Sequence, residues 1–289
     1  MSDDDLGIDI VASGLYLPEC PRWHDGHLWF SDIRGDAVHR IDDGRVSVVH
    51  RFPDGEEPAG LGWLPNGDLL VAGMAKRVIY RVSGGRATVY ADVKQLAPHQ
   101  INDMVVTSDG TAFVTQLGCD LDAAQPTPQP TVVIRVDPDG GVSAAAGDLM
   151  VPNGIAVDET ENTLVVAESG AARLSSFILR DGVLSNRTYE PLPATAAVPF
   201  CAPDGICLDE QGGRWVADSI NKRVSRVHAG VVTDEHHLDQ FVLACVLGDH
   251  DRRSLYICVT DAWHKSDIRE HPTGRVLRLR VAVPGAGRP

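Results

Sequence analysis

The stretches VPNGIAVDETENTLVVAES (151–169) and APDGICLDEQGGRWVADS (202–219) are near copies of one another. Each has a proline, then Asn or Asp, then a glycine at its second to fourth positions, and each holds two short apolar runs separated by a polar turn. Such runs are too short for helices, are rich in strand-forming residues and are bounded by Gly, Asp and Asn, so each copy predicts neighbouring antiparallel strands. A repeated strand unit predicts a repeat architecture.

The same unit occurs six times along the chain. One position recurs in every copy at a spacing of 41 to 52 residues, and it is held by Asp32, Gly73, Gln116, Glu168, Asp218 and Val259. A period of this length with several short strands per unit is typical of a β-propeller blade. We therefore predict an all-β, six-bladed β-propeller in one domain over residues 1–289. Residues 1–14 are expected to form an N-terminal extension or a closing strand, and 282–289 a flexible tail.

A second position recurs about 13 to 15 residues earlier, where the innermost strand of each blade should begin. It is held by Glu19, Ala59, Asn102, Asn153, Asp204 and, with a looser alignment, Cys245. In a propeller these positions converge on the central channel, so two carboxylates and two amides should meet there. Two carboxylates about 4 Å apart repel by roughly 4 kcal/mol at an effective dielectric near 20. A divalent cation would relieve that repulsion, and all-oxygen ligation suits Ca²⁺, Mg²⁺ or Mn²⁺.

Asn-Gly and Asp-Gly are also common turn sequences, because Asn, Asp and Gly tolerate positive φ. Asn153 and Asp204 could therefore be turn residues without a ligand role. Glu19 is no turn former, and its equivalent place in the first repeat favours the channel interpretation.

Composition and charge exclude some classes of function. The chain has 289 residues, 40 acidic against 26 basic side chains and a net charge of −14, which argues against nucleic acid or an anionic membrane as partner. The acidic N-terminus and the lack of a long apolar run predict a cytoplasmic protein. Six dispersed cysteines without a Cys-x-x-Cys pair predict buried free thiols. The chain has no Gly-x-Ser-x-Gly motif, so the sequence gives no support for a serine nucleophile.

Four short motifs give the chain its resemblance to the regucalcin/gluconolactonase (senescence-marker-protein-like) family of metal-dependent lactonases. In order they are ECP (19–21), QIND (100–103), PNGI (152–155) and PDG (203–205). The resemblance implies one divalent cation, calcium foremost with magnesium, manganese or zinc as alternatives, bound by Glu19, Asn153 and Asp204. It also implies that Asp204 is the catalytic base for opening a lactone or ester, and that Asn102 binds the metal directly or holds substrate or water beside it. Asp218 and Ser219 would lie next to the metal ligands and hold them in position.

The chain departs from the family pattern at two motif positions. Cys20 stands where the family has glycine after the ligand Glu, which is tolerable if the position needs no positive φ. Gln100 replaces the Arg with which sugar-lactone members of the family hold substrate oxygens, so both the charge and the paired donors of Arg are missing. This favours a less polar lactone or ester as the substrate.

Further substrate contacts are expected at the mouth of the channel. The candidates are Gln100, Asp120, which matches an acidic family contact, His99 and Trp263; His250 and His264 are also expected near the channel mouth. Two longer inserts, 118–131 and 261–273, are expected to roof the pocket. The partner is expected to be a small molecule, and the protein a monomer or homodimer. Two alternatives stay open: a metal-dependent isomerase or lyase on a carbonyl substrate, and a non-catalytic calcium-binding propeller.

Overall fold

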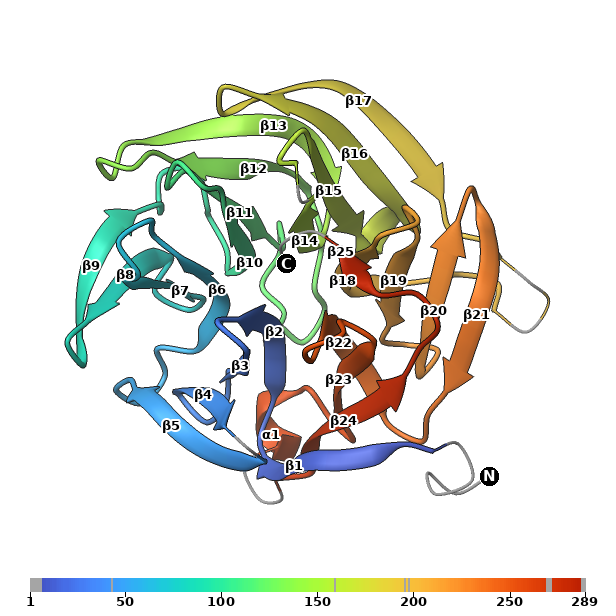
Figure 1. Ribbon diagram of the computed structural model, residues 1–289. Coiled ribbons are helices and arrows are strands. Elements are labelled where there is room, and N and C mark those ends of the chain that lie inside the picture. The colour runs from blue at the N-terminus through green and yellow to red at the C-terminus, as the bar shows by residue number, and fades with distance from the viewer. Residues whose placement is uncertain are drawn as a thin grey trace.

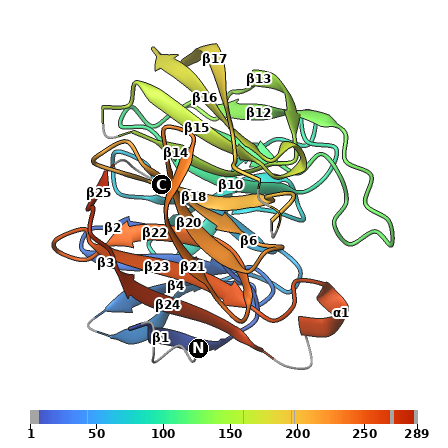
Figure 2. The same cartoon turned by 90° about the vertical axis from the view of Figure 1, so that its right-hand side faces the viewer.

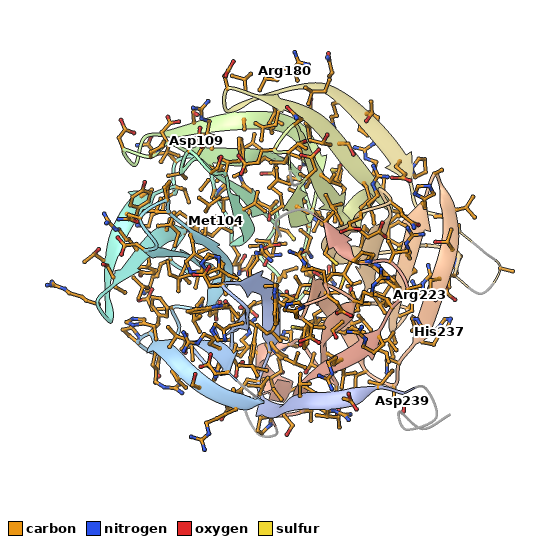
Figure 3. All side chains as sticks on the ribbon, viewed as in Figure 1. Met104, Asp109, Arg180, Arg223, His237 and Asp239 are labelled. Atoms are coloured by element: carbon orange, nitrogen blue, oxygen red, sulfur yellow. The ribbon has the colours of Figure 1, made fainter. Side chains whose placement is uncertain are left out.

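The computed structural model describes residues 7–42, 44–158, 160–194, 196, 198–268 and 272–286. Over these residues six antiparallel sheets surround a central axis, which confirms the six-bladed β-propeller (Figure 1). Met104 lies near the axis, whereas Arg180 and Asp239 lie at the rim (Figure 3).

Each blade is a meander whose first strand faces the channel. Blades one and two comprise β2 (Pro18–His24), β3 (His27–Asp32), β4 (Ala37–Asp42), β5 (Arg45–Arg51), β6 (Pro58–Trp63), β7 (Leu69–Gly73), β8 (Val78–Ser83) and β9 (Arg86–Asp92). Blades three and four comprise β10 (Ile101–Val106), β11 (Ala112–Gln116), β12 (Pro130–Val136), β13 (Val142–Met150), β14 (Pro152–Val157), β15 (Thr163–Glu168), β16 (Arg173–Arg180) and β17 (Val183–Pro191). Blades five and six comprise β18 (Pro203–Asp209), β19 (Arg214–Asp218), β20 (Arg223–His228), β21 (Val231–His237), β22 (Phe241–Gly248), β23 (Ser254–Thr260) and β24 (Gly274–Arg280).

The two ends of the chain are tied into the ring. Strand β1 (Asp9–Leu15) pairs with β24, so the N-terminal segment supplies the outer strand of the sixth blade and closes the propeller. Near the C-terminus, β25 (Gly285–Ala286) pairs with the end of β18. This corrects the expectation of a flexible tail for residues 285 and 286, because the Gly285 amide also donates to the Arg252 carbonyl at 2.7 Å. Residues 1–6 and 287–289 lie outside the described residues.

The strand register confirms the repeat alignment. In blades one to five the first repeated position pairs with the residue that begins the inner strand, as in Pro18 with Asp32, Pro152 with Glu168 and Pro203 with Asp218. In the sixth blade Val242 pairs with Val259, so Leu243 holds the channel position and the alignment of Cys245 was wrong. The thiol of Cys245 instead lies 3.9 Å from that of Cys207 in the core.

Close packing around the axis explains the glycines that follow Asn153 and Asp204. A Cβ at Gly154 would lie 2.4 Å from the Asp204 carbonyl oxygen, and one at Gly205 would lie 2.4 Å from the Ala244 Cβ. Neither glycine has positive φ, and Asn153 and Asp204 lie inside strands β14 and β18. The turn interpretation therefore fails at both motifs.

The position after Glu19 behaves differently. Cys20 has a φ of 48°, so this position does take the left-handed conformation that glycine adopts at least cost. The condition for an easy replacement of glycine is not met, and the chain carries backbone strain next to the site. All six cysteines are buried and free, as predicted.

The longer inserts project from one face of the propeller. Figure 2 shows the loop between β11 and β12 and helix α1 (Lys265–Ile268) on one side and β25 on the other. Within the described part of the chain, no helix is long and apolar enough to cross a membrane.

Candidate active site

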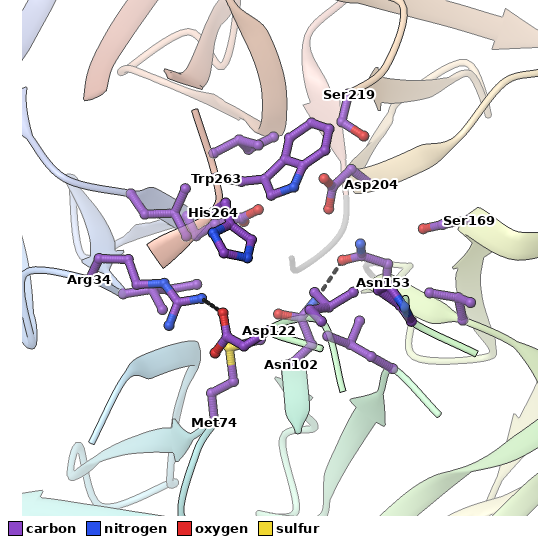
Figure 4. A pocket seen from close by; sticks show the side chains of 18 of the residues that line it. Arg34, Met74, Asn102, Asp122, Asn153, Ser169, Asp204, Ser219, Trp263 and His264 are labelled. Carbon is purple, nitrogen blue, oxygen red and sulfur yellow. Dashed lines mark hydrogen bonds and ion pairs between the residues drawn. The ribbon is translucent and has the colours of Figure 1, made fainter. Parts of the chain in front are cut away.

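A cavity of about 330 Å³ opens on the axis at the end of the channel where the inner strands begin (Figure 4). Its floor is made by the channel position of five blades, namely Glu19, Asn102, Asn153, Asp204 and Leu243. The register of every inner strand shifts just after this residue, as at a β-bulge, which turns the local backbone. The repeat thus delivers side chains far apart in sequence to one point.

The floor brings together the residues predicted as metal ligands. Glu19, Asn153 and Asp204 line the same cavity, and Asn102 joins them by donating from Nδ2 to Asn153 Oδ1 at 2.5 Å (Figure 4). Glu19 and Asp204 are both buried. Their roles remain predictions, while their proximity is a feature of the fold.

The electrostatics of the floor are unfavourable without a cation. Burial raises the pKa of Glu19 to about 7, and the negative charge of Asp103 adds to this, against a hydrogen bond from the Cys20 amide. Burial also raises the pKa of Asp204 well above its usual range, Glu19 raises it further, and a hydrogen bond from Asn153 opposes the shift. Each carboxylate therefore disfavours ionisation of the other.

This donor set fits a hard divalent cation. Two carboxylates and two amide oxygens are the ligands that such ions take, and a cation would offset the repulsion between Glu19 and Asp204. Among the residues described, no three His, Cys, Asp or Glu side chains gather as metal ligands. The predicted ligand set is compatible with this absence, because only Glu19 and Asp204 among its members belong to these residue types.

A buried ion pair lies next to the floor, and the sequence analysis missed it. The Arg22 guanidinium donates to Asp103 and, at 2.7 Å, to the Met104 carbonyl, and its Nε donates to the Leu61 carbonyl at 3.1 Å. Asp103 in turn accepts from the Ile155 amide at 3.3 Å. The pair thus joins the inner strands of the first four blades. The sequence does hint at this pair, because Arg22 directly follows the ECP motif and Asp103 is the last residue of the QIND motif.

The acidic residues at the first repeated position brace the starts of the inner strands. Asp32 accepts from the Leu17 amide at 2.7 Å, Glu168 from the Met150 amide at 2.9 Å and Asp218 from the Ala202 amide at 3.1 Å. Asp218 also pairs with Arg223 at 3.0 Å. It therefore fixes the backbone just before Asp204, and Ser219 lines the cavity directly.

The residues predicted to contact substrate separate into two groups. Asn102 and Trp263 line the cavity, and so does His264. Gln100, Asp120 and His99 are absent from its lining. Gln100 Nε2 donates to Asp120 Oδ1 at 2.9 Å, so the two candidates bind one another beside the cavity. His250 lies in an exposed turn between β22 and β23, at the opposite end of β22 from Leu243 and the cavity, so its expected place near the channel mouth was wrong.

Both inserts reach over the cavity, as expected for a roof. The first contributes Leu121, Asp122 and Pro126, and the second contributes Trp263 and His264.

Ion pairs anchor these inserts to the rim. Arg34 donates to Asp122 at 2.8 Å and to Glu57 at 2.5 Å, and Lys265 from α1 reaches Glu57 at 2.7 Å. The sequence analysis missed Arg34, although it stands two residues after the repeated Asp32.

Comparisons with known proteins agree with this architecture. The sequence model of the SMP-30/gluconolactonase/LRE-like region matches residues 17–261, so the chain belongs to that family. A 6-deoxy-6-sulfogluconolactonase of Pseudomonas putida is 28% identical over 97% of this chain and 96% of its own. A gluconolactonase of Zymomonas mobilis is 25% identical over 73% of this chain and 67% of its own.

A solved structure shares the fold. The calcium-binding protein regucalcin of Agrobacterium tumefaciens superposes with a TM-score of 0.75 at 18% identity, covering 97% of this chain and 95% of its own.

Proposed function

We propose that this protein is a lactonase that depends on a divalent cation and opens its substrate by attack of water. The observation that carries the proposal is the pair of buried carboxylates, Glu19 and Asp204, which meet beside Asn102 and Asn153 at the floor of an axial cavity. Membership of the SMP-30/gluconolactonase family and the similarity to two proteins named as lactonases support hydrolysis of a lactone.

Glu19, Asn153 and Asp204 would hold the cation in this proposal. A bound divalent ion would polarise the lactone carbonyl and stabilise the charge that develops on its oxygen. Calcium is the first choice because the oxygen donors include neutral amides, and magnesium, manganese and zinc are the alternatives to be compared.

Asp204 acts as the general base. It accepts a proton from the water molecule whose oxygen attacks the carbonyl carbon. A bound cation would lower the pKa of the attacking water, so that the Asp204 carboxylate can accept its proton. The ring C–O bond then breaks, and the proton passes to the leaving oxygen to give the open-chain hydroxy acid.

The remaining residues position this chemistry. Asn102 lies at the floor, where its amide can orient a substrate oxygen while it holds Asn153. Asp218 fixes the backbone before Asp204, and the Arg22–Asp103 pair fixes the inner strands of blades one to four.

The test uses protein treated with EDTA and then supplied with calcium, magnesium, manganese or zinc. Lactone hydrolysis, followed by acid release, is expected to be lost on chelation and restored by at least one of these ions. Cation binding without turnover of any lactone would instead indicate a binding protein. Turnover of a carbonyl compound without hydrolysis would indicate an isomerase or lyase.

A further inference from the structure

The wall of the cavity divides into an apolar side and a more polar side, where two serines lie beside the apolar Val151 and Ile220. The residue that follows the first repeated position is Ile33 in blade one, Met74 in blade two and Leu117 in blade three, but Ser169 and Ser219 in blades four and five. Leu17 and Leu243 extend the apolar side to blades one and six. Since Asn153 and Asp204 also come from blades four and five, the polar side coincides with part of the reacting floor.

Three polar side chains of the wall already have partners within the protein. Arg34 pairs with Asp122 at 2.8 Å, Ser169 donates to the Pro203 carbonyl at 2.5 Å, and His264 Nδ1 lies 2.8 Å from Ser266 Oγ. A polyhydroxylated sugar lactone that used these three side chains would have to replace their bonds, and hydroxyl groups that lay against the apolar side chains would stay unsatisfied; both are costly.

The balanced charges at the rim also disfavour a charged substrate. The positive charges of Arg34 and Lys265 face the negative charges of Glu57 and Asp122 in one network. No excess charge of either sign remains in this network for an anionic or cationic substituent. Gln100, in place of an arginine, is hydrogen-bonded to Asp120.

We propose that the substrate is a neutral lactone with an alkyl or aryl substituent, which lies against Ile33, Met74 and Leu117 beneath Trp263 while the lactone carbonyl faces the floor. This inference rests on the proposed lactonase function and names its substrate class. The cavity of about 330 Å³ would hold roughly eleven water molecules at ~30 Å³ each, which suits a ligand of about a dozen non-hydrogen atoms. A lactone ring with a short alkyl chain has this size.

The test compares lactones with the same ring and different substituents. The values of kcat/KM are measured for δ-valerolactone, δ-decalactone and δ-gluconolactone with the cation-loaded protein. Each buried methylene is expected to raise kcat/KM about fourfold, so δ-decalactone should exceed δ-valerolactone by roughly 100-fold if three or four carbons of its chain are buried. δ-Gluconolactone should be no better than δ-valerolactone.

Variants at Met74 locate the substituent. Met74→Gln keeps the length of the side chain but makes it polar, and it should raise KM for δ-decalactone about tenfold with a much smaller effect for δ-valerolactone. Met74→Leu is the matched control, because it keeps an apolar side chain of similar volume and should stay within about threefold of the parent protein. Thermal unfolding and calcium binding of both variants verify that the site is intact.

A binding measurement separates substrate choice from catalysis. Calorimetry of the metal-free protein should detect δ-decalactone and not δ-gluconolactone. Faster hydrolysis of δ-gluconolactone would overturn the substrate class and leave the lactonase function standing. Failure to hydrolyse any lactone with any of the four cations would overturn the proposed function, and the substrate class with it.

Discussion

Replacing Glu19 by glutamine should change the stability of the protein in opposite directions with and without a cation. Burial raises the pKa of Glu19 from 4.5 to about 7. The folded protein therefore holds this proton more tightly than the unfolded chain does. The stability that goes with the protonated form is fully present below pH 4.5 and is lost as the pH rises through about 7.

The size of the effect follows from that shift. A displacement of about 2.5 pH units at 1.36 kcal/mol each amounts to at most about 3 kcal/mol at pH 8, part of which is shared with Asp204. Glutamine has nearly the same shape and no charge. Metal-free Glu19→Gln should therefore unfold up to roughly 5 °C above the parent protein at pH 8, with little difference at pH 4.

Calcium should reverse the sign. Calcium at about 1,000 times its dissociation constant would stabilise the folded parent protein by about 4.1 kcal/mol, which exceeds the gain of at most about 3 kcal/mol, and the variant forfeits most of this when it loses a charged ligand. Differential scanning calorimetry in EDTA and in excess calcium measures both effects. The exposed Glu210→Gln is the matched control, since it changes the net charge equally. A Glu19→Gln effect of the same sign in both media would refute the argument.

Three further substitutions test other parts of the site. Asp204→Asn should lower lactone hydrolysis by roughly 10²- to 10⁴-fold at saturating calcium, while a smaller calcium-induced rise in Tm than that of the parent persists; activity within threefold of the parent would contradict the general-base role. Asp103→Asn leaves the buried Arg22 charge without its partner and should cost roughly 3–5 kcal/mol in urea unfolding, an interpretation that a loss below about 1 kcal/mol would rule out. Gly205→Ala places a methyl group 2.4 Å from the Ala244 Cβ and should destabilise by about 1–3 kcal/mol, whereas Gly147→Ala, with open space around it, should be nearly neutral.

The repeats made the architecture predictable from sequence. Short β-rich runs at a regular spacing define blades, and the channel position then follows by symmetry, which is how Glu19, Asn153 and Asp204 were placed together. The sixth blade was the exception, because neither Leu243 nor Cys245 carries a polar signal and the register of β22 against β23 decides between them.

Features set by side-chain direction and by packing between blades were not predictable. Gln100 and Asp120 bind one another outside the cavity lining, and sequence spacing gives no sign of this hydrogen bond. Arg34 lines the cavity because a distant insert places Asp122 beside it. The φ of 48° at Cys20 is likewise a backbone feature that composition does not encode.

The most direct test of the account is a crystal structure of the protein grown with calcium, examined for electron density on the propeller axis. The account predicts one ion within about 2.3–2.6 Å of oxygen atoms from Glu19, Asn153 and Asp204. Calcium bound elsewhere, with these three side chains coordinating nothing, would contradict it.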